Sequence, residues 1–247
     1  MTTKGTIIVT GASRGIGASI AIHLARQGFT IACLTRRAEL PPACSADREA
    51  LARCVAIACD VTKPESMRAA FAQAAALGKP VVGVVNNAGV HLEGPSDRFS
   101  LEDYETVFAT NATSVFLGCQ NAYPHLLAAG GGLIVNIGSF FDKMGVKRNL
   151  AYCASKAAVG AITRCLGVEW ASKGIRVMDI APGYISTDLN KESMEGPLKE
   201  FLEKRIPGRK PGTAEDVAKL VAALFTIDSP FLTGETIYID GAHAIAH

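Results

Sequence analysis

Short apolar runs rich in β-branched residues alternate along the chain with longer, alanine-rich stretches in which apolar residues recur at helical spacing. The short runs are apolar on both faces, as expected of parallel strands covered by helices on each side. Right-handed crossovers between such strands produce a doubly wound sheet. The pattern therefore predicts an α/β fold with a seven-stranded parallel sheet and helices on both faces. The predicted strands are Thr6–Thr10, Thr30–Thr35, Val55–Cys59, Val81–Asn86, Leu133–Gly138, Arg176–Ala181 and Glu235–Asp240.

Hydroxyl residues mark the starts of three predicted helices. Thr62, Ser100 and Thr213 each stand three positions before an acidic residue, which is the spacing of a capping box. The stretch Ala38–Arg53 contains two prolines and mixed charges, so it is interpreted as a loop that leads into a short helix.

A second irregular stretch, at about residues 182–212, is longer than an ordinary loop. It follows the sixth predicted strand, at the edge of the sheet where doubly wound folds bind ligands. We therefore expect a mobile substrate lid, and the alternative is a surface segment without a role. Its apolar residues include Leu189, Met194, Leu198, Phe201 and Leu202.

Composition narrows the class of protein. The 247 residues are 49% hydrophobic and 19% charged, with a formal net charge of +2. The length suits one domain spanning residues 1–247, and the small charge predicts no nucleic-acid or membrane partner. The seven cysteines include no C-x-x-C pair, so reduced thiols are expected, and no cluster of residues has metal-ligand spacing. Without a secretory segment or an apolar run that could span a bilayer, we expect a cytoplasmic protein.

A glycine-rich turn follows the first predicted strand and opens a helix. In such a turn, backbone N–H groups and the positive end of the helix can meet a pyrophosphate. The spacing is Gly-x-x-x-Gly-x-Gly, and the alternative is a tight turn that serves close packing of helix on strand. The residues of the turn are Gly11, Ala12, Ser13, Arg14, Gly15, Ile16 and Gly17.

The end of the second predicted strand suggests which dinucleotide would bind. A fold that binds NAD usually offers an acidic residue there to the ribose 2′-hydroxyl. This chain has Arg36 and Arg37 instead, and Arg14 lies within the glycine turn. Three guanidinium groups could pair with a 2′-phosphate, which predicts NADP(H), while a solvated basic corner is the alternative.

Polar residues with possible chemistry follow the later strands. Asn86-Asn87-Ala88-Gly89 closes the fourth predicted strand, Asn111 lies within a predicted helix, and Ser139 comes just past the fifth strand. Tyr152 and Lys156 are four residues apart, so they share a helix face. On its own, such a pair usually means a packed phenol beside a solvated amine.

Taken in order, these motifs resemble the short-chain dehydrogenase/reductase family, and the resemblance covers the chain from Thr6 to Gly241. It implies one NAD(P)-binding Rossmann domain that transfers a hydride between NADP(H) and a ketone or secondary alcohol. The alternative is a non-catalytic member that only binds a dinucleotide, and the intact catalytic set favours the enzyme. The matching motifs are the glycine turn, Asp60-Val61, Asn87-Ala88-Gly89, Asn111, Ser139, Tyr152, Lys156, and Pro182-Gly183 with Thr187.

The resemblance also implies catalytic roles. Tyr152 would exchange a proton with the carbonyl oxygen, Ser139 would hydrogen-bond that oxygen, and Asn111 would hold a water in a proton relay. Lys156 would hold the ribose hydroxyls and lower the pKa of the phenol. An ammonium about 4 Å from the phenol supplies about 4 kcal/mol at an effective dielectric near 20, enough for a shift of about 3 units.

Further residues are expected around the cofactor and the substrate. The resemblance implies that Asp60 lies against the adenine, Asn87 lies along the cofactor, and Ile185 with Thr187 binds the carboxamide. Ser155 and Cys153 are interpreted as packing residues. The substrate pocket is expected to be mostly apolar and to favour a ketone with a hydrophobic arm. The expected pocket residues are Ser139, Tyr152, Phe140, Phe141, Met144, Val146, Tyr184 and His91.

The substrate and the assembly are the least constrained expectations. The overall pattern looks like 3-oxoacyl-acyl-carrier-protein reductases, although Ala128–Gly132 has no basic residue where those enzymes dock their carrier. A 3-oxoacyl thioester is therefore one expectation, and a sugar, steroid or cyclic alcohol is the alternative. Lys143, Lys147 and Arg148 are interpreted as a solvated loop, with steering of an anionic substrate as the alternative. Wide apolar faces on the predicted helices, and the pairing seen in relatives, predict a homotetramer, with a dimer second.

Overall fold

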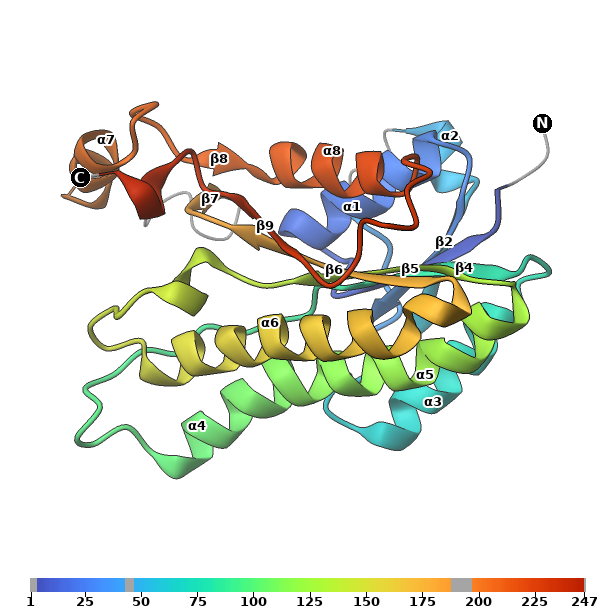
Figure 1. Ribbon diagram of the computed structural model, residues 1–247, viewed down its shortest axis with the longest axis horizontal. Coiled ribbons are helices and arrows are strands. Elements are labelled where there is room, and N and C mark those ends of the chain that lie inside the picture. The colour runs from blue at the N-terminus through green and yellow to red at the C-terminus, as the bar shows by residue number, and fades with distance from the viewer. Residues whose placement is uncertain (1–3, 43–46, 188–196, 247) are drawn as a thin grey trace.

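The computed structural model describes residues 4–42, 47–187 and 197–246 (Figure 1). Its main sheet has seven strands in the order β3-β2-β1-β4-β5-β6-β9, and every neighbouring pair is parallel. This confirms the predicted doubly wound Rossmann-type fold. The strands lie within one residue of their predicted bounds: β1 Thr6–Thr10, β2 Thr30–Thr35, β3 Cys54–Ala58, β4 Val81–Asn86, β5 Gly132–Ile137, β6 Ile175–Pro182 and β9 Thr236–Ile239.

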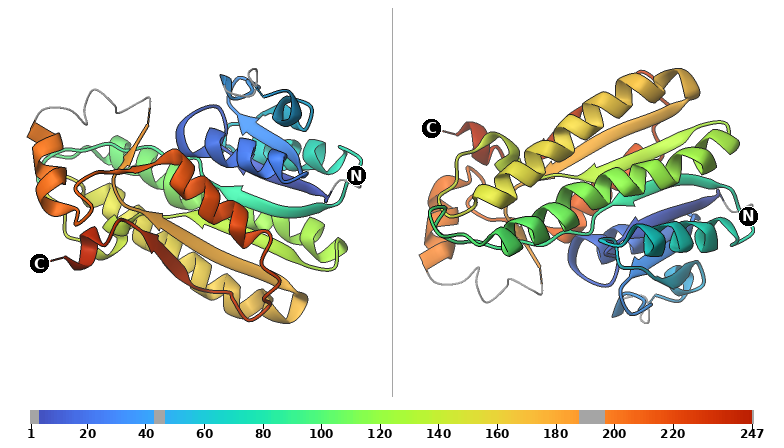
Figure 2. Two further views of the ribbon diagram at one scale, coloured as in Figure 1. Left: turned by 90° about the horizontal axis from the view of Figure 1, so that it is seen from above. Right: turned by 90° about the horizontal axis from the view of Figure 1, so that it is seen from below.

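Helices cover both faces of the sheet (Figures 1 and 2). One face carries α1 (Gly15–Arg26) and α8 (Ala214–Leu224), and the other carries α3 (Pro64–Ala75), α5 (Ser114–Ala128) and α6 (Leu150–Trp170). The remaining helices are α2 (Arg48–Leu51), which ends the predicted loop, α4 (Leu101–Phe108) and α7 (Pro197–Arg205).

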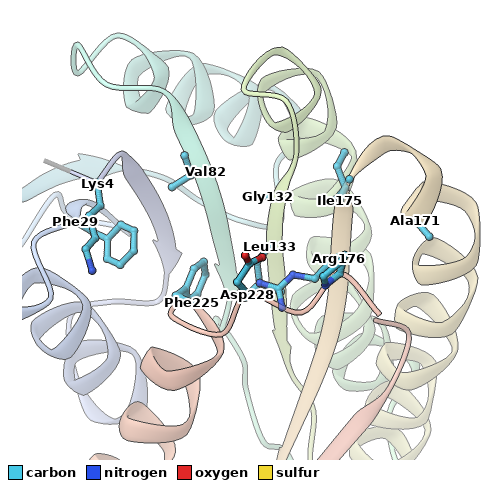
Figure 3. A pocket seen from close by; sticks show the side chains of 12 residues that line it. Lys4, Phe29, Val82, Gly132, Leu133, Ala171, Ile175, Arg176, Phe225 and Asp228 are labelled. Carbon is cyan, nitrogen blue, oxygen red and sulfur yellow. The ribbon is translucent and has the colours of Figure 1, made fainter. Parts of the chain in front are cut away.

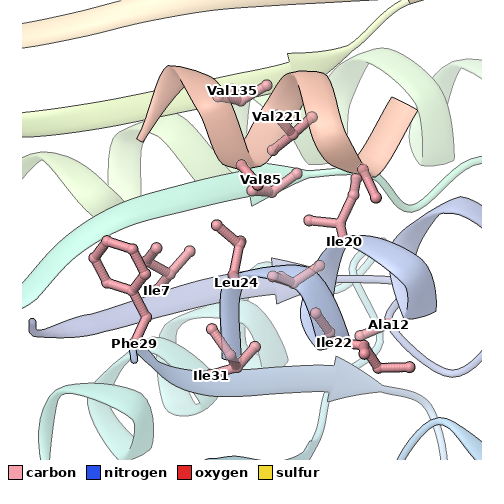
Figure 4. Close-up of a cluster of buried hydrophobic side chains, with 14 of the residues drawn as sticks. Ile7, Ala12, Ile20, Ile22, Leu24, Phe29, Ile31, Val85, Val135 and Val221 are labelled. Atoms are coloured by element: carbon pink, nitrogen blue, oxygen red, sulfur yellow. The ribbon is translucent and has the colours of Figure 1, made fainter. Parts of the chain in front are cut away.

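Each layer between helices and sheet is filled by apolar side chains. Figure 4 shows Leu24 of α1 and Val221 of α8 packed over Val85 and Val135 of the sheet, and all four are fully buried. Burying a side chain of this size stabilises the fold by about 1.5–3 kcal/mol. These two layers hold the strands rigidly, so their carboxyl ends form a fixed platform for a site.

Two of the three predicted helix caps are confirmed. The Ser100 hydroxyl accepts a hydrogen bond from the backbone N–H of Asp103, and Thr213 forms a complete capping box with Asp216. The prediction for Thr62 is wrong, because α3 begins one residue later. Pro64, which has no N–H to satisfy, occupies its first turn. The Thr62 hydroxyl instead donates to Asp60 Oδ1 at 2.7 Å.

The long helix predicted to run through Asn111 changes its geometry in the middle. A π-helical turn, Ala109–Thr113, separates α4 from α5. Such turns are rare and are frequently found at functional sites. Helix α6 continues into a 3₁₀ turn, Ala171–Lys173.

Short elements complete the carboxyl-terminal part of the described chain. β7 (Ile185–Ser186) pairs with β8 (Gly212–Thr213), so the two ends of the predicted lid are joined to each other. The predicted lid residues Leu189 and Met194 lie outside the described residues. No disulfide joins any two of the six described cysteines, and Cys44 also lies outside the described part of the chain. No helix of the described residues is long and apolar enough to cross a bilayer.

Candidate active site

A cavity of about 330 Å³ lies at the carboxyl ends of the central strands, where β4, β5 and β6 give way to loops. This is the edge at which doubly wound sheets bind ligands. The structure brings Ser139, Tyr152 and Lys156 together in its wall. The residues that line the cavity are Ile16, Asn87, Gly89, Val90, His91, Ile137, Gly138, Ser139, Phe140, Phe141, Tyr152, Lys156, Pro182, Gly183, Tyr184, Ile185 and Thr187.

Lys156 is held firmly at the base of the cavity. It lies on α6, one turn after Tyr152, and only 5% of its surface is exposed. Its Nζ donates to the carbonyl oxygen of Ile137 at 2.7 Å and lies 5.7 Å from the centre of the Tyr152 ring. Burial lowers the pKa of Lys156 to about 8. The carbonyl therefore fixes the position of the ammonium beside the phenol.

The electrostatics of Tyr152 differ from the sequence expectation. Desolvation raises the pKa of the phenol, and the hydrogen bond with the Ser139 hydroxyl opposes this only in part. Desolvation of the phenol outweighs the lowering expected from Lys156, whose Nζ donates its hydrogen bond to the Ile137 carbonyl. In this arrangement the phenol stays protonated at neutral pH and is suited to donate a proton.

Asn111 lies behind the cavity rather than in its lining. Its Oδ1 accepts from the backbone N–H of Val90 at 2.8 Å, and its Nδ2 donates to the Val90 carbonyl at 2.9 Å and to Ser155 Oγ at 3.2 Å. A side chain at Gly89 would bring a Cβ within 3.4 Å of Asn111 Oδ1 and within 3.9 Å of Lys156 Nζ. Gly89 therefore keeps the space between the amide and the ammonium open.

Ser155 does more than fill space, which corrects its interpretation as a packing residue. It is fully buried, and its hydroxyl donates to the Tyr152 carbonyl at 2.8 Å while accepting from Asn111. The π-helical turn that carries Asn111 is thus tied directly to the turn of α6 that carries Tyr152. The residues next to Ser155 in the sequence do not indicate this hydrogen bond, because Asn111 is distant in the chain.

The backbone of the glycine turn and its close packing both require glycine. Gly11 and Gly15 have φ of +65° and +56°, which side chains rarely adopt. A Cβ at Gly17 would come within 2.4 Å of Asn87 Nδ2, the group that donates to Thr10 O at 3.0 Å and to Gly11 O at 3.2 Å. Asn87 therefore also braces the turn, in addition to lining the cavity.

The start of α1 fits an anion. Arg14 is the N-cap residue, but it makes no side-chain cap, and the first turn contains no acidic residue. Helix N–H groups left uncapped in this way suit a phosphate. Together with the glycine turn that precedes it, this helix start could hold the pyrophosphate of a dinucleotide.

The three predicted arginines also meet at one place. A separate cavity of about 610 Å³ is lined by Ser13, Arg14, Thr35, Arg36, Arg37, Glu39 and Pro42. Arg37 is partly committed there, because its Nε lies 3.1 Å from Glu39 Oε1. Asp60 lies nearby: the Thr62 hydroxyl is the main cause of its lowered pKa, and the charge of Arg36 contributes.

Aromatic side chains surround the Tyr152 phenol. The ring of His91 lies 4.7 Å from that of Tyr152, and Phe141 meets Tyr152 and Tyr184 edge-on at 5.9 and 6.1 Å. All of them line the cavity with Ser139, so the four predicted substrate-binding residues are brought together. Met144 and Val146, expected in the pocket, are not among the lining residues.

Two partners of this aromatic wall were missed from the sequence. The buried Asn149 side chain accepts a hydrogen bond from His91 Nε2, and Asn149 Nδ2 donates to the Lys147 carbonyl at 2.9 Å. His243, near the carboxyl terminus, packs its ring 5.5 Å from Tyr184 and 6.4 Å from Phe201 of α7. Only tertiary structure brings these residues to the site.

The remaining predicted cofactor residues lie around these cavities without lining them. Ala88 N–H donates to Thr10 Oγ1 at 3.0 Å, and Gly11, Gly15 and Gly17 form the turn itself. Asp60 and Val61 follow β3, with Asp60 Oδ1 accepting from the backbone N–H of Thr62 at 3.0 Å.

Another cavity, of about 430 Å³, lies at the opposite end of the sheet, where β1, β5 and β6 begin. Figure 3 shows Phe29 and Phe225 on one side of it and Arg176 with Asp228 on the other. Its lining contains none of the residues expected to be catalytic. Among the described residues, no group of acidic, histidine and cysteine side chains could hold a metal ion.

Comparison with known proteins finds relatives that match nearly the whole chain. A family model described as enoyl-(acyl carrier protein) reductase matches residues 11–242. A 3β-hydroxysteroid dehydrogenase 1 of Eggerthella lenta is 36% identical over 96% of this chain and 92% of its own. A human 3-oxoacyl-[acyl-carrier-protein] reductase is 34% identical over 94% of this chain and 95% of its own.

A solved structure has the same fold. It is described as a 2-deoxy-D-gluconate 3-dehydrogenase from Agrobacterium tumefaciens with bound NADP. It is 31% identical, has a TM-score of 0.89, and covers 99% of this chain and 98% of its own. These relatives share nearly the full length of the chain, so the resemblance is not confined to the nucleotide end.

Proposed function

The chain belongs to the short-chain dehydrogenase/reductase family, and on that premise we propose that it transfers a hydride between NADP(H) and a ketone or secondary alcohol. The observation that carries this proposal is the meeting of Ser139, Tyr152 and Lys156 in one cavity at the carboxyl edge of the sheet. Bound nicotinamide supplies or accepts the hydride at the substrate carbon. Side chains of this protein would supply the proton to the substrate and stabilise the charge that develops.

In the reducing direction, Tyr152 gives its proton to the carbonyl oxygen. Its raised pKa keeps the phenol protonated until charge develops on that oxygen. The Ser139 hydroxyl hydrogen-bonds the same oxygen, and the ammonium of Lys156 stabilises the phenolate left behind. Asn111 holds the Val90 backbone and, with Lys156, borders the space in front of Gly89. A water held there would relay a proton from solvent back to Tyr152.

NADP(H) is the proposed cofactor. The support is the cavity lined by Arg14, Arg36 and Arg37 at the end of β2, where an NAD-binding fold would offer an acid. The NADP bound to the A. tumefaciens relative is consistent with this choice. The uncapped start of α1 would hold the pyrophosphate, and Pro182, Gly183, Ile185 and Thr187 would flank the nicotinamide.

The proposed substrate is a ketone with an apolar body. Phe140, Phe141 and Tyr184 form an apolar part of the cavity wall, and this wall suits a ring system or an acyl chain better than a polyol. The relative from E. lenta supports the steroid alternative, and the human relative supports a 3-oxoacyl thioester. Arg148 lies 3.7 Å from Glu93, and Lys143 lies over the Tyr238 ring, so neither charge is committed to steering a substrate.

We also propose that residues 182–212 act as a lid within a single domain. The β7–β8 ladder fixes the base of this segment, where Gly212 N–H donates to the Tyr184 carbonyl at 2.9 Å. Phe201 of α7 packs its ring 6.4 Å from that of His243, and the His243 ring lies 5.5 Å from that of Tyr184 in the cavity wall. Movement of α7 would therefore open or close the aromatic wall.

The homotetramer and the cytoplasmic location remain proposals. Apolar side chains on the outer surfaces of α5 and α6 support association: Phe116 is 46% exposed and Val168 is 84% exposed. Light scattering should give a tetramer at micromolar concentration, and a monomer would contradict the proposal.

The proposed function is tested by following NADPH absorbance with a panel of steroid, cyclic, sugar and 3-oxoacyl thioester ketones. Turnover of at least one apolar ketone, abolished by Tyr152→Phe, is the expected result. NADPH binding without turnover of any member would indicate the non-catalytic alternative, and a clear preference for NADH would contradict the cofactor.

A further inference from the structure

A carboxylate is buried directly behind the catalytic lysine. Asp179 lies in the middle of β6 and has no exposed surface. Its neighbours Val177 and Met178 belong to the cores on opposite faces of the sheet, so Asp179 shares the face of Val177. That face is covered by α6, the helix that carries Tyr152 and Lys156 (Figure 1).

Two glycines make the space that Asp179 occupies. A Cβ at Gly138 would come within 2.5 Å of Asp179 Oδ1, and a Cβ at Gly160 would come within 3.9 Å of Oδ2. Lys156, Gly160 and Arg164 are spaced by four residues, so they follow one face of α6. Asp179 therefore faces the helix at the turn between a catalytic ammonium and a guanidinium.

The carboxylate is poorly satisfied by hydrogen bonds. Thr236 Oγ1 donates to its Oδ2 at 3.1 Å, while no described residue hydrogen-bonds its Oδ1, which is also buried. A buried charge with so few partners is costly unless nearby opposite charge compensates for it. The ammonium of Lys156 is such a charge, and it too is buried.

Other charged and titratable groups complete the cluster, and they lie on its outer side. Asp142, in the 3₁₀ turn Phe140–Lys143, accepts from Tyr238 of β9 at 2.6 Å. Lys143 Nζ lies 4.0 Å from the centre of the Tyr238 ring. A point at the Cβ position of Gly160 is 3.3 Å from Arg164 Nη1 and 3.9 Å from Asp142 Oδ2. Asp142 thus has partners of its own away from Lys156.

We propose that Asp179 is a positioning residue that acts through Lys156: its buried negative charge keeps the lysine in the ammonium form that the reaction requires. This inference rests on the proposed function, because it assigns a partner to the lysine of that same site. Asp179 touches neither the cavity nor the phenol, so its effect is electrostatic.

The direction of the effect follows from the two groups. Burial raises the pKa of Asp179 to about 6, and the charge of Lys156 opposes that rise, so above this pH Asp179 is ionised. Burial lowers the pKa of Lys156 to about 8, and the charge of Asp179 opposes that fall. Without the carboxylate, the lysine would lose its proton at a lower pH. The alkaline limb of the activity profile would move in the same direction.

The experiment compares the full-length wild type with Asp179→Asn and with the matched control Asp142→Asn. Two readouts are measured against pH: kcat and kcat/KM for NADPH-dependent reduction, and the rate at which a small acylating reagent modifies Lys156, followed by peptide mass spectrometry. The second readout needs neither cofactor nor substrate. If the wild type shows no NADPH-dependent turnover, the proposed function fails, but the labelling profiles still decide the role of Asp179.

In Asp179→Asn, both the alkaline limb and the labelling midpoint should move by about 1 pH unit to lower pH, as expected for loss of one nearby opposite charge. In Asp142→Asn, both should stay in place, because Asp179 remains ionised there. Equal profiles for the wild type and Asp179→Asn would overturn the proposal, as would equal shifts in both variants.

A third variant covers the case in which Asp179→Asn does not fold. Asp179→Ala removes the carboxylate together with its unpaired buried oxygen, so it leaves no amide without partners in this space. The labelling midpoint of Lys156 should again move to lower pH. An unchanged midpoint in a folded Asp179→Ala protein would overturn the proposal.

Discussion

Replacing Arg36 by alanine should weaken NADPH much more than NADH. Arg36 shares its cavity with Arg14 and Arg37 at the end of β2. Since Arg37 is partly neutralised by Glu39 at 3.1 Å, Arg36 is the less committed of the two neighbouring guanidinium groups at this corner. Arg36 would bind the 2′-phosphate, which NADPH carries and NADH lacks, so its replacement should affect NADPH binding selectively.

The size of the effect follows from exposure. A hydrogen bond to a charged group contributes about 1.5–3 kcal/mol to binding. Arg36 is exposed, so solvent screening places the loss near the lower end, at about 1.5 kcal/mol, or roughly a tenfold increase in the Kd for NADPH. Arg36→Asp adds repulsion between the carboxylate and the phosphate, so its effect should be larger. Both effects should shrink as salt concentration rises.

The assay measures Kd by the fluorescence of bound NADPH and NADH, together with kcat/KM for each cofactor. Arg37→Ala is the matched control, and its effect should be smaller because Glu39 already pairs with that side chain. The reasoning is refuted if Arg36→Ala weakens NADH and NADPH equally, or if the unmodified protein already prefers NADH.

Three further predictions concern the rest of the site. Tyr152→Phe should bind NADPH almost normally while kcat collapses, and near-normal turnover would show that Tyr152 is not the proton donor. Ser155→Ala should lower the free energy of unfolding in urea by about 1–2 kcal/mol, because Asn111 Nδ2 loses a buried hydrogen-bond partner. Its kcat should fall less than that of Asn111→Ala, since both hydrogen bonds between Asn111 and Val90 remain, and an equal fall in kcat would contradict this expectation. Backbone amides of α7, Pro197–Arg205, should exchange hydrogen more slowly when NADPH and a ketone analogue are bound, and unchanged exchange would contradict the lid.

The parts of the structure that were predictable are those whose signals are local. Strands buried on both faces appear in the sequence as apolar runs, so β1, β2 and β4 begin and end at the predicted residues. The pairing of Tyr152 with Lys156 follows from their spacing on a helix, and the meeting of Arg14 with Arg36 follows from the turn and strand that carry them.

The parts that were not predictable depend on contacts between distant segments. The cap expected at Thr62 fails because Asp60 competes for the hydroxyl, and Pro64 already suits the first turn. The lowered pKa expected for Tyr152 left out the desolvation of the phenol, which depends on the residues that the fold packs around it. The approach of His243 to the pocket has no counterpart in the local sequence.

The π-helical turn at Ala109–Thr113 also limits how this protein can be engineered. One residue accounts for about 100° of rotation in a regular helix, so deleting a single residue there would let α4 run into α5 with ordinary α-helical hydrogen bonds. Asn111 would then turn away from Val90 and Ser155. A selection for heat resistance alone would favour such a deletion, because a regular helix is more stable than a π-helical turn. The proposed activity would then be lost, because Asn111 would no longer be in its place. Stabilising designs should therefore keep the length of this segment fixed.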